Sequence, residues 1–302
     1  MDFTDFAKGI NVSMKNSLIK GACDLHTHSF NSDGTYSPSE LIDEAERIGL
    51  YAIALTDHNT IDGLTEFLKA AEGKQVKAIP GVEFSTDYKN KELHIIALFV
   101  GEEHYGKIQE LTLELLGRKE ASYKNLCKAL SLDGINVDYE KIKREAHGMP
   151  NRAHIAEALT KAGYTKSIKD AFNTLLSKDG RYYKEPTKLD VFETIKFIKS
   201  IGAVAVLAHP LISIDEGQLH EFLPKAKKAG LDAMETIYHA YTKEQTELAK
   251  QIANQYGILE SGGSDFHGER RPNVSLGVGE GELFIDKEIA IQLKKRANSS
   301  KT

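Results

Sequence analysis

The fold is decided by the stretch Ala22-Cys23-Asp24-Leu25-His26-Thr27-His28, a short apolar run that ends in two histidines. Alternate side chains of a β-strand face the same way, so His26 and His28 are expected to point together, with Asp24 behind them. Two imidazoles fixed on one face are a suitable start for a metal site. Two surface histidines at a strand end would give the same spacing, so this pattern alone leaves both interpretations open.

Further apolar runs follow at intervals and alternate with helical patterns. They are Ala52–His58, Lys77–Ser85, Leu93–Val100, Ala203–His209, Asp232–Tyr238 and Ile258–Ser261. Such alternation predicts βα units and a parallel sheet or barrel. The first helix has a clear start at Ser37-Pro38-Ser39-Glu40, where a capping serine precedes a proline and a glutamate, and Gly49 is expected to end it.

One long stretch interrupts this alternation. From Gly101 to about Pro186 the patterns are helical, and helices are expected over residues 110–130, 152–161 and 167–176. The simplest account is a helical subdomain, residues 101–186, inserted into a discontinuous barrel domain of residues 22–100 and 187–290. Insertions at the C-terminal ends of barrel strands lie beside the active site, so this one is placed to cover it. Residues 1–21 would be an N-terminal extension.

Composition limits the classes of function. The chain has 302 residues and a formal net charge of −5, which argues against a protein dedicated to long nucleic acids. A small phosphorylated substrate is compatible with this charge, because metal ions can supply positive charge locally. Two cysteines allow no disulfide framework, and the longest apolar run, Ile95–Val100, is too short to span a membrane. We therefore expect a soluble cytoplasmic protein with no membrane association, and the oligomeric state is left open.

Residues of the types that bind metals recur where the strand patterns end. Beyond the first run they are Asp57, His58, Glu83, His94, His209, Asp265 and His267. Barrel enzymes collect their catalytic groups at this edge of the sheet. Packing alone explains the pattern poorly, because a buried polar side chain is costly unless it is satisfied.

These motifs together resemble those of a known family. The set D-L-H-x-H-S…S-D-G, T-D-H-N-T, G-V-E, A-H-P and G-S-D-F-H-G, spread from about Ala22 to Gly277, is similar to that of the PHP (polymerase and histidinol phosphatase) family. The resemblance implies an α/β fold in the form of a distorted seven-stranded (β/α)7 barrel, with a trinuclear metal site. The cofactors would be up to three divalent ions of manganese, iron or zinc.

The resemblance also implies a ligand for each ion. The first would be held by His26, His28, Glu83 and Asp265, the second by Asp33, His58 and His209, and the third by Glu83, His94 and His267. Glu83 would thus bridge two ions and count as a catalytic residue. An aspartate at position 33 is similar to the nucleotide-phosphatase branch of the family, whereas histidinol-phosphatase members can have histidine there.

The insert resembles that same branch. The segment from Asn151 to Ala156 looks like its G-R-P-H-I-A motif, with departures at Asn151 and Ala153. The planar guanidinium of Arg152 suits a phosphate, so Arg152 is predicted to bind substrate and to act in catalysis, although an exposed helix arginine is the plainer alternative. His154 would contact substrate, donate a proton or cap the insert.

One further histidine is a candidate for substrate binding. His239 follows the sixth strand pattern and is expected either at the mouth of the barrel or on a solvent-facing loop.

The predicted function is hydrolysis of a phosphate monoester of a small metabolite by a metal-activated water. A nucleotide such as a nucleoside 3′,5′-bisphosphate is the preferred substrate. The enzymatic alternatives are a histidinol-phosphate phosphatase and a 5′→3′ exonuclease on short oligonucleotides. The alternative from another class is a non-catalytic metal-binding module, which should have lost at least one ligand, whereas this sequence keeps all nine.

Overall fold

The computed structural model describes residue 19 and residues 21–146, 150–178 and 180–299. Within them the chain forms two compact units. The first contains the described residues up to Gln109 and from Leu189 onward, and the second is Glu110–Lys188. The predicted N-terminal extension, residues 1–21, lies almost wholly outside the described residues. The predicted barrel and insert boundaries, and a covering role for the insert, stay predictions.

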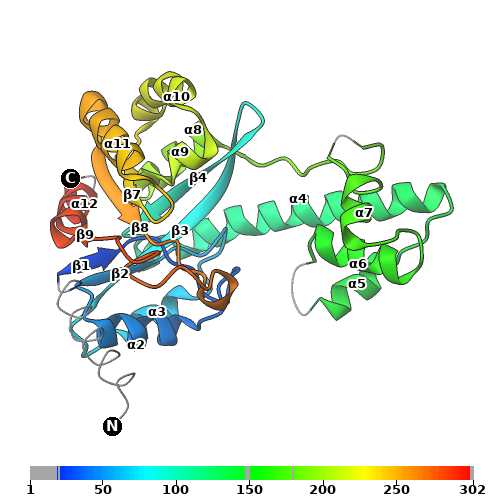
Figure 1. Ribbon diagram of the computed structural model, residues 1–302, viewed down its shortest axis with the longest axis horizontal. Coiled ribbons are helices and arrows are strands. Elements are labelled where there is room, and N and C mark those ends of the chain that lie inside the picture. The colour runs from blue at the N-terminus through cyan, green and yellow to red at the C-terminus, as the bar shows by residue number, and fades with distance from the viewer. Residues whose placement is uncertain (1–18, 20, 147–149, 179, 300–302) are drawn as a thin grey trace, which may run out of the picture. The chain divides into compact units, whose positions relative to one another are not determined.

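The first unit is built on one curved sheet with helices around it (Figure 1). Its strands are β1 (Ala22–Asp24), β2 (Ala52–Leu55), β3 (Lys77–Tyr88), β4 (Lys91–Leu98), β5 (Leu189–Asp190), β6 (Val204–Leu207), β7 (Ala233–Tyr238), β8 (Leu259–Gly263) and β9 (Ile285–Asp286). They follow the order β8-β7-β6-β4-β3-β2-β1-β9, and β5 pairs with β3. The predicted apolar runs correspond to β1–β4 and β6–β8, and β5 and β9 are short additions.

The sheet curls until β8 meets β1. The Leu25 N–H donates to the carbonyl of Gly262 at 3.3 Å, and Thr27 pairs with Phe266 in a parallel bridge. The sheet is therefore a nearly closed barrel, which confirms the predicted α/β barrel class.

One strand runs against the predicted direction. Strand β4 is antiparallel to both β3 and β6, whereas the alternation of strands and helices predicted parallel neighbours. The cause is a two-residue turn at Lys89 and Asn90, which have φ angles of 52° and 64°. Positive φ at both turn residues gives a tight β-hairpin. Because β4 is reversed, His94 reaches the ligand edge from the first half of its strand, where it pairs with Ser85.

Helices cover the sheet of the first unit. They are α2 (Pro38–Ile48), α3 (Leu64–Ala70), α8 (Val191–Ser200), α9 (Pro210–Ser213), α10 (Glu216–Ala229), α11 (Lys243–Tyr256) and α12 (Lys287–Ser299). The start of α2 is as predicted, since Ser37 and Glu40 form a capping box and Gly49 ends the helix at a φ of 82°. The main hydrophobic cluster joins Leu293 of α12 with alternate residues of the sheet, such as Ala52 and Ala54.

The second unit is helical in its described residues. It contains most of α4 (Tyr105–Leu132), together with α5 (Tyr139–Glu145), α6 (Arg152–Lys161) and α7 (Ile168–Asn173). A separate hydrophobic cluster joins them, with Leu126 and Leu130 of α4 packed among Ile155 and Leu159 of α6. The sequence predicted α4, α6 and α7 but missed α5, whose start is capped by the side chain of Asp138.

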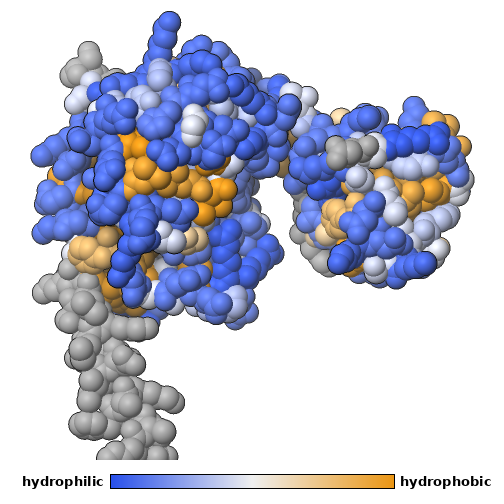
Figure 2. Space-filling view, turned by 45° about the horizontal axis from the view of Figure 1, so that its top comes forward, coloured by the Kyte–Doolittle hydropathy of each residue, from blue (hydrophilic) through white to orange (hydrophobic). Residues whose placement is uncertain are grey.

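The face of the molecule in Figure 2 is mainly hydrophilic, with separate hydrophobic areas on each unit. Among the described residues, no helix combines the length and the apolar character needed to cross a membrane. The cytoplasmic location expected from the sequence stays a prediction.

Candidate metal centre

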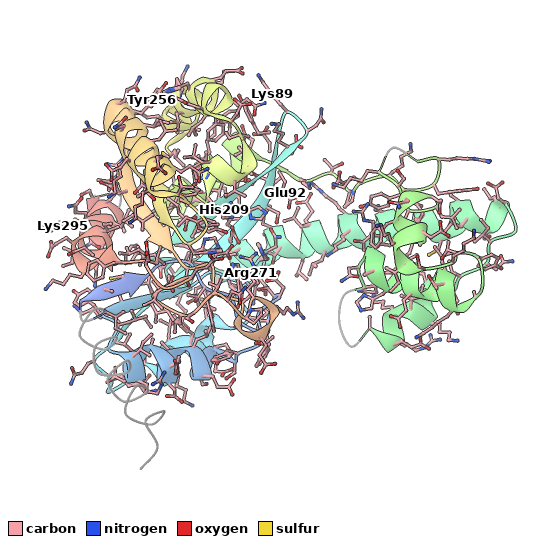
Figure 3. The ribbon with its side chains drawn as sticks, in the orientation of Figure 1. Lys89, Glu92, His209, Tyr256, Arg271 and Lys295 are labelled. Atoms are coloured by element: carbon pink, nitrogen blue, oxygen red, sulfur yellow. The ribbon has the colours of Figure 1, made fainter. Side chains whose placement is uncertain are left out.

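All nine predicted metal ligands lie close together in the first unit. They are His26, His28, Asp33, His58, Glu83, His94, His209, Asp265 and His267. In groups of three or four, their ligand atoms lie within 4.8 Å of one another. They come from strands β3 and β4 and from the segments that follow β1, β2, β6 and β8. Figure 3 labels one of them, His209, near Glu92 and Arg271, two side chains that contact other members of the group.

Glu83 is the centre of this cluster. Its side chain is fully buried and approaches five imidazoles. The atoms closest to its carboxylate are His26 Nε2 at 3.3 Å, His28 Nε2 at 3.4 Å, His58 Nδ1 at 2.9 Å, His94 Nδ1 at 2.9 Å and His209 Nε2 at 3.3 Å. Burial alone would raise the pKa of Glu83, but the nearby histidines hold it well below its usual value.

The groups of neighbouring side chains differ in part from the predicted sets of ligands. His267 Nε2 lies 3.1 Å from Asp33 Oδ1 and groups with His28, Asp33 and His58, whereas the prediction paired it with Glu83 and His94. His209 instead groups with Glu83 and His26. In the metal-free protein, His267 thus lies with residues predicted for the second ion and His209 with residues predicted for the first, and the division of ligands among ions stays a prediction.

The chemistry of these side chains fits divalent metal ions. Several buried atoms at the centre have no hydrogen-bond partner among the described residues. They are His26 Nε2, both ring nitrogens of His28, His58 Nδ1, Glu83 Oε2, His209 Nδ1 and His267 Nε2. Unpaired buried polar atoms are costly, and imidazole nitrogens with carboxylate oxygens are the ligands that zinc, iron and manganese accept. A metal ion would satisfy them.

The backbone is strained at two of these residues. His209 and Asp265 have φ angles of 30° and 52°, in the left-handed region that residues other than glycine rarely adopt. Such strain persists only where the surrounding structure enforces it, and it collects at functional sites. Here it turns both side chains toward the cluster directly after β6 and β8.

Comparison with known proteins assigns the family. The PHP domain profile matches residues 24–176. A 5′-3′ exoribonuclease of Haemophilus influenzae is 32% identical over 245 residues, which cover 81% of this chain and 89% of the relative. The chain belongs to the PHP family.

Other PHP relatives agree in their chemistry. A 3′,5′-nucleoside bisphosphate phosphatase of Chromobacterium violaceum is 27% identical over 247 residues, covering 81% of this chain and 86% of the relative. A solved structure from Bifidobacterium adolescentis, described provisionally as a metal-dependent phosphoesterase, is 27% identical with a TM-score of 0.69, over 91% of this chain and 96% of the other. This PHP protein is a phosphoric ester hydrolase of the metal-dependent phosphoesterase type.

The sequence interpretation missed Glu235 of β7. Its carboxylate is fully buried, lies 3.0 Å from His26 Nδ1 and accepts a hydrogen bond from the His209 N–H at 2.7 Å. A carboxylate on Nδ1 places the imidazole proton there and leaves Nε2 of His26 free to bind a metal. An acidic residue inside the apolar run Asp232–Tyr238 was the signal, since a buried charge needs a partner.

Two further buried carboxylates hold the ligand-bearing loops. Asp24 accepts hydrogen bonds from the N–H and hydroxyl of Ser264 and from the Gly277 N–H, and burial raises its pKa to about 6. Asp57 accepts from the N–H and hydroxyl of Ser29, ahead of Asp33. Both orient the ligands by fixing backbone and hydroxyl groups beside them.

A tyrosine and an arginine hold the outer oxygen of Asp265. Asp265 Oδ1 faces His28 Nε2 at 3.1 Å, while Oδ2 accepts from Tyr238 Oη at 2.8 Å and from Arg271 Nη1 at 2.5 Å. The Arg271 side chain is 41% exposed, so this PHP site has a cation at its margin. Neither residue was singled out from the sequence.

The three residues predicted to bind substrate, Arg152, His154 and His239, do not all belong to the same unit. Arg152 begins α6, and its guanidinium lies 4.5 Å from the ring centre of Tyr183 and 5.3 Å from that of Phe172. His154 completes a capping box by accepting from the Asn151 N–H at 3.1 Å. Both belong to the second unit. His239 follows β7 in the first unit, and its side chain is 9% exposed.

A substitution at Glu83 tests the centre of the cluster. Glu83→Gln removes the negative charge that five histidines approach, so it should lower metal affinity by at least about tenfold. This is the lower end of the loss in affinity that follows when a group around a metal ligand is changed. His94→Ala should weaken binding less, because His94 belongs to one group only. Metal content per chain after dialysis measures both, with Glu221→Gln as the control, because Glu221 is an exposed carboxylate that pairs with Lys89. Full metal content in folded Glu83→Gln would contradict the central role.

Metal binding should depend on pH through His94. Burial opposes its charge, but Glu83 and Glu92 on its two ring nitrogens raise its pKa to about 10 in the metal-free protein. Imidazole binds a metal in its neutral form, so binding must release this proton. The apparent affinity for manganese should therefore increase as pH rises toward 10. Calorimetry in buffers of different ionisation enthalpy measures the proton release, and an affinity independent of pH would refute it.

Proposed function

We propose that this PHP phosphoesterase hydrolyses a phosphate monoester of a small nucleotide, such as a nucleoside 3′,5′-bisphosphate. The observation that carries the proposal is the cluster around Glu83, in which nine ligand-type side chains come together and seven of their buried atoms make no hydrogen bond within the described residues. The relatives named as a bisphosphate phosphatase and an exoribonuclease support a nucleotide as the class of substrate.

The nine side chains would hold up to three divalent ions, of manganese, iron or zinc. Bound ions of this kind supply a hydroxide nucleophile near neutral pH and neutralise the phosphate oxygens. The protein's own contribution is to fix the ligands before substrate arrives. Glu235 keeps the proton of His26 on Nδ1, and Tyr238 with Arg271 holds one oxygen of Asp265 so that the other faces the histidines.

We also propose that Arg152 binds a phosphate of the substrate and that His154 contacts it. In support, Nη1 of Arg152 makes one hydrogen bond, at 3.4 Å to the Leu176 carbonyl, and the rest of its planar fork lies against aromatic rings. Stacked rings hold a guanidinium in a fixed orientation without neutralising it. His239 is the third proposed substrate contact.

Exonuclease activity on short oligonucleotides is the second candidate. The exoribonuclease relative matches 81% of this chain, which favours it. A net charge of −5 limits the number of phosphates that the protein can contact, so only a short segment of such a substrate would be bound. Both candidate activities use the same metal cluster and differ in the leaving group that hydrolysis releases.

Metal depletion and a substrate comparison test the proposal. A chelator should abolish hydrolysis of nucleoside 3′,5′-bisphosphate, and added manganese, iron or zinc should restore it. The same assay on nucleoside monophosphates, 5′-phosphorylated oligonucleotides and histidinol phosphate ranks the candidates by kcat/KM. Faster release of mononucleotides from oligonucleotides would favour the second candidate. Full activity in protein shown to contain no metal would exclude both.

Arg152→Ala tests the phosphate contact in the second unit. Loss of one charged hydrogen-bonding partner costs about 1.5–3 kcal/mol, or about tenfold to more than a hundredfold in kcat/KM. A fall for every phosphoester would place Arg152 on the scissile phosphate, and a fall for bisphosphates alone would place it on the second one. Metal content should not change.

Two further variants control this experiment. Arg152 packs on aromatic rings, so Arg152→Lys, which keeps the charge but not the fork, and a thermal melt separate binding from stability. Arg181→Ala is the matched control, because Arg181 is 76% exposed in the same unit and pairs with Asp133. Kinetics of Arg152→Ala equal to those of Arg181→Ala would show that Arg152 has only a structural role.

A further inference from the structure

A cavity lies beside the metal centre within the first unit. It has a volume of about 710 Å³ and is lined by the end of β7, the start of α11 and the segment before β9. Tyr238 belongs to both places, because its ring lines the cavity and its hydroxyl donates to Asp265 at 2.8 Å. Tyr241, also in the wall, accepts a hydrogen bond from the N–H of Leu211, two residues after His209. Two tyrosines of the cavity wall are therefore hydrogen-bonded to the segments that carry Asp265 and His209.

His239 gives the cavity wall an unused polar group. Its side chain is 9% exposed, and its Nδ1 is buried with no hydrogen-bond partner among the described residues. The carboxylate of Glu280 is 3.9 Å away, too far for a hydrogen bond. Burial lowers the pKa of His239, so the ring is neutral at physiological pH and offers one donor and one acceptor.

The charges of the wall argue against a phosphate there. Three carboxylates, from Glu247, Glu280 and Glu282, outnumber the two ammonium groups of Lys243 and Lys250. Each lysine also has a glutamate nearby, since Lys243 lies 3.9 Å from Glu282 and Lys250 lies 3.6 Å from Glu247. An anion would meet net repulsion, whereas an uncharged group with donors and acceptors on its edge would find partners.

The apolar part of the wall suits a flat ring. Phe284 is 43% exposed and stands in the wall with Tyr238 and Tyr241. Aromatic side chains bind nucleic-acid bases by stacking, with little dependence on which base is present. The volume lies in the range of small-molecule sites, enough for a base with part of its sugar.

We propose that this cavity binds the nucleobase of the substrate, which stacks on Phe284 and shares hydrogen bonds with His239 while its phosphate lies at the metal cluster. The inference rests on the proposed function for the phosphate but makes a separate claim about the base. It accounts for the unpaired imidazole, the exposed phenylalanine and the glutamates, which would accept from exocyclic amines.

Equilibrium binding tests the cavity without catalysis. The full-length, metal-free protein is titrated with adenosine and with ribose in a calorimeter. Adenosine should bind and ribose should not, and Phe284→Ala and His239→Ala should each weaken adenosine binding about tenfold, the order of a lost stacking partner. Thr246→Trp fills the cavity from α11 and should have the same effect in case either truncation disturbs the fold.

The matched control is Phe30→Ala. Phe30 is another exposed phenylalanine, at 55%, and lies two residues after His28, outside the cavity wall. Its loss should leave the binding of adenosine unchanged. The proposal is overturned if the parent protein does not bind adenosine, or if Phe30→Ala weakens binding while Phe284→Ala and Thr246→Trp do not.

Kinetics separate this inference from the proposed function. The ratio of kcat/KM for adenosine monophosphate to that for ribose 5-phosphate should fall about tenfold in Phe284→Ala and Thr246→Trp. If the protein hydrolyses both esters and these ratios match the parent's, the cavity assignment fails and the phosphoesterase proposal stands. If it hydrolyses no phosphoester but binds adenosine as described, the proposed function fails and the cavity assignment stands.

Discussion

The carboxylate of Glu83 is the group on which the rest of the site depends. It is fully buried, and five imidazoles from four different segments approach it. A charge in the interior of a protein is tolerated only when opposite charges or metal ions surround it. The strands that carry these histidines must therefore keep their register, since a shift of one residue would turn His26 or Glu83 to the other face of the sheet. Both the closure of the barrel and the chemistry of the site therefore depend on the register of the strands.

Other buried carboxylates make the cluster rigid. Asp24 and Asp57 bind the backbone and hydroxyl groups of the segments before Asp265 and Asp33, and Glu235 fixes His26. Together their hydrogen bonds hold the ligands in place, although several ligands lie outside regular strands. Changing a group that orients a metal ligand in this way typically lowers metal affinity by about tenfold to a hundredfold. The left-handed backbone of His209 and Asp265 is one cost of this arrangement.

The distribution of charge explains why metal ions suit this chain. The protein carries a net charge of −5, and three of the nine ligand side chains are carboxylates. A phosphate substrate is also negative. Arg271 contacts the cluster directly, and its positive charge is already paired with Asp265. Divalent ions would reverse the local charge and attract the phosphate. The adjacent cavity keeps an excess of glutamates, so the two places suit different parts of one ligand.

The sequence by itself determined the strands of the barrel, the start and end of α2, and the nine side chains that meet in one place. These follow from local patterns, because alternation, capping residues and turn glycines act over a few neighbouring positions. Only the tertiary structure decided the direction of β4, which ligand side chains lie next to one another, and the contacts of Glu235. The direction of β4 depends on two turn residues with positive φ, Lys89 and Asn90, which are not the glycine-containing pair that marks such turns in a sequence. The grouping of ligands depends on distances of a few ångströms between segments, and Glu235 meets His26 across 209 positions of the chain. No local pattern records a contact that exists only once the barrel has closed.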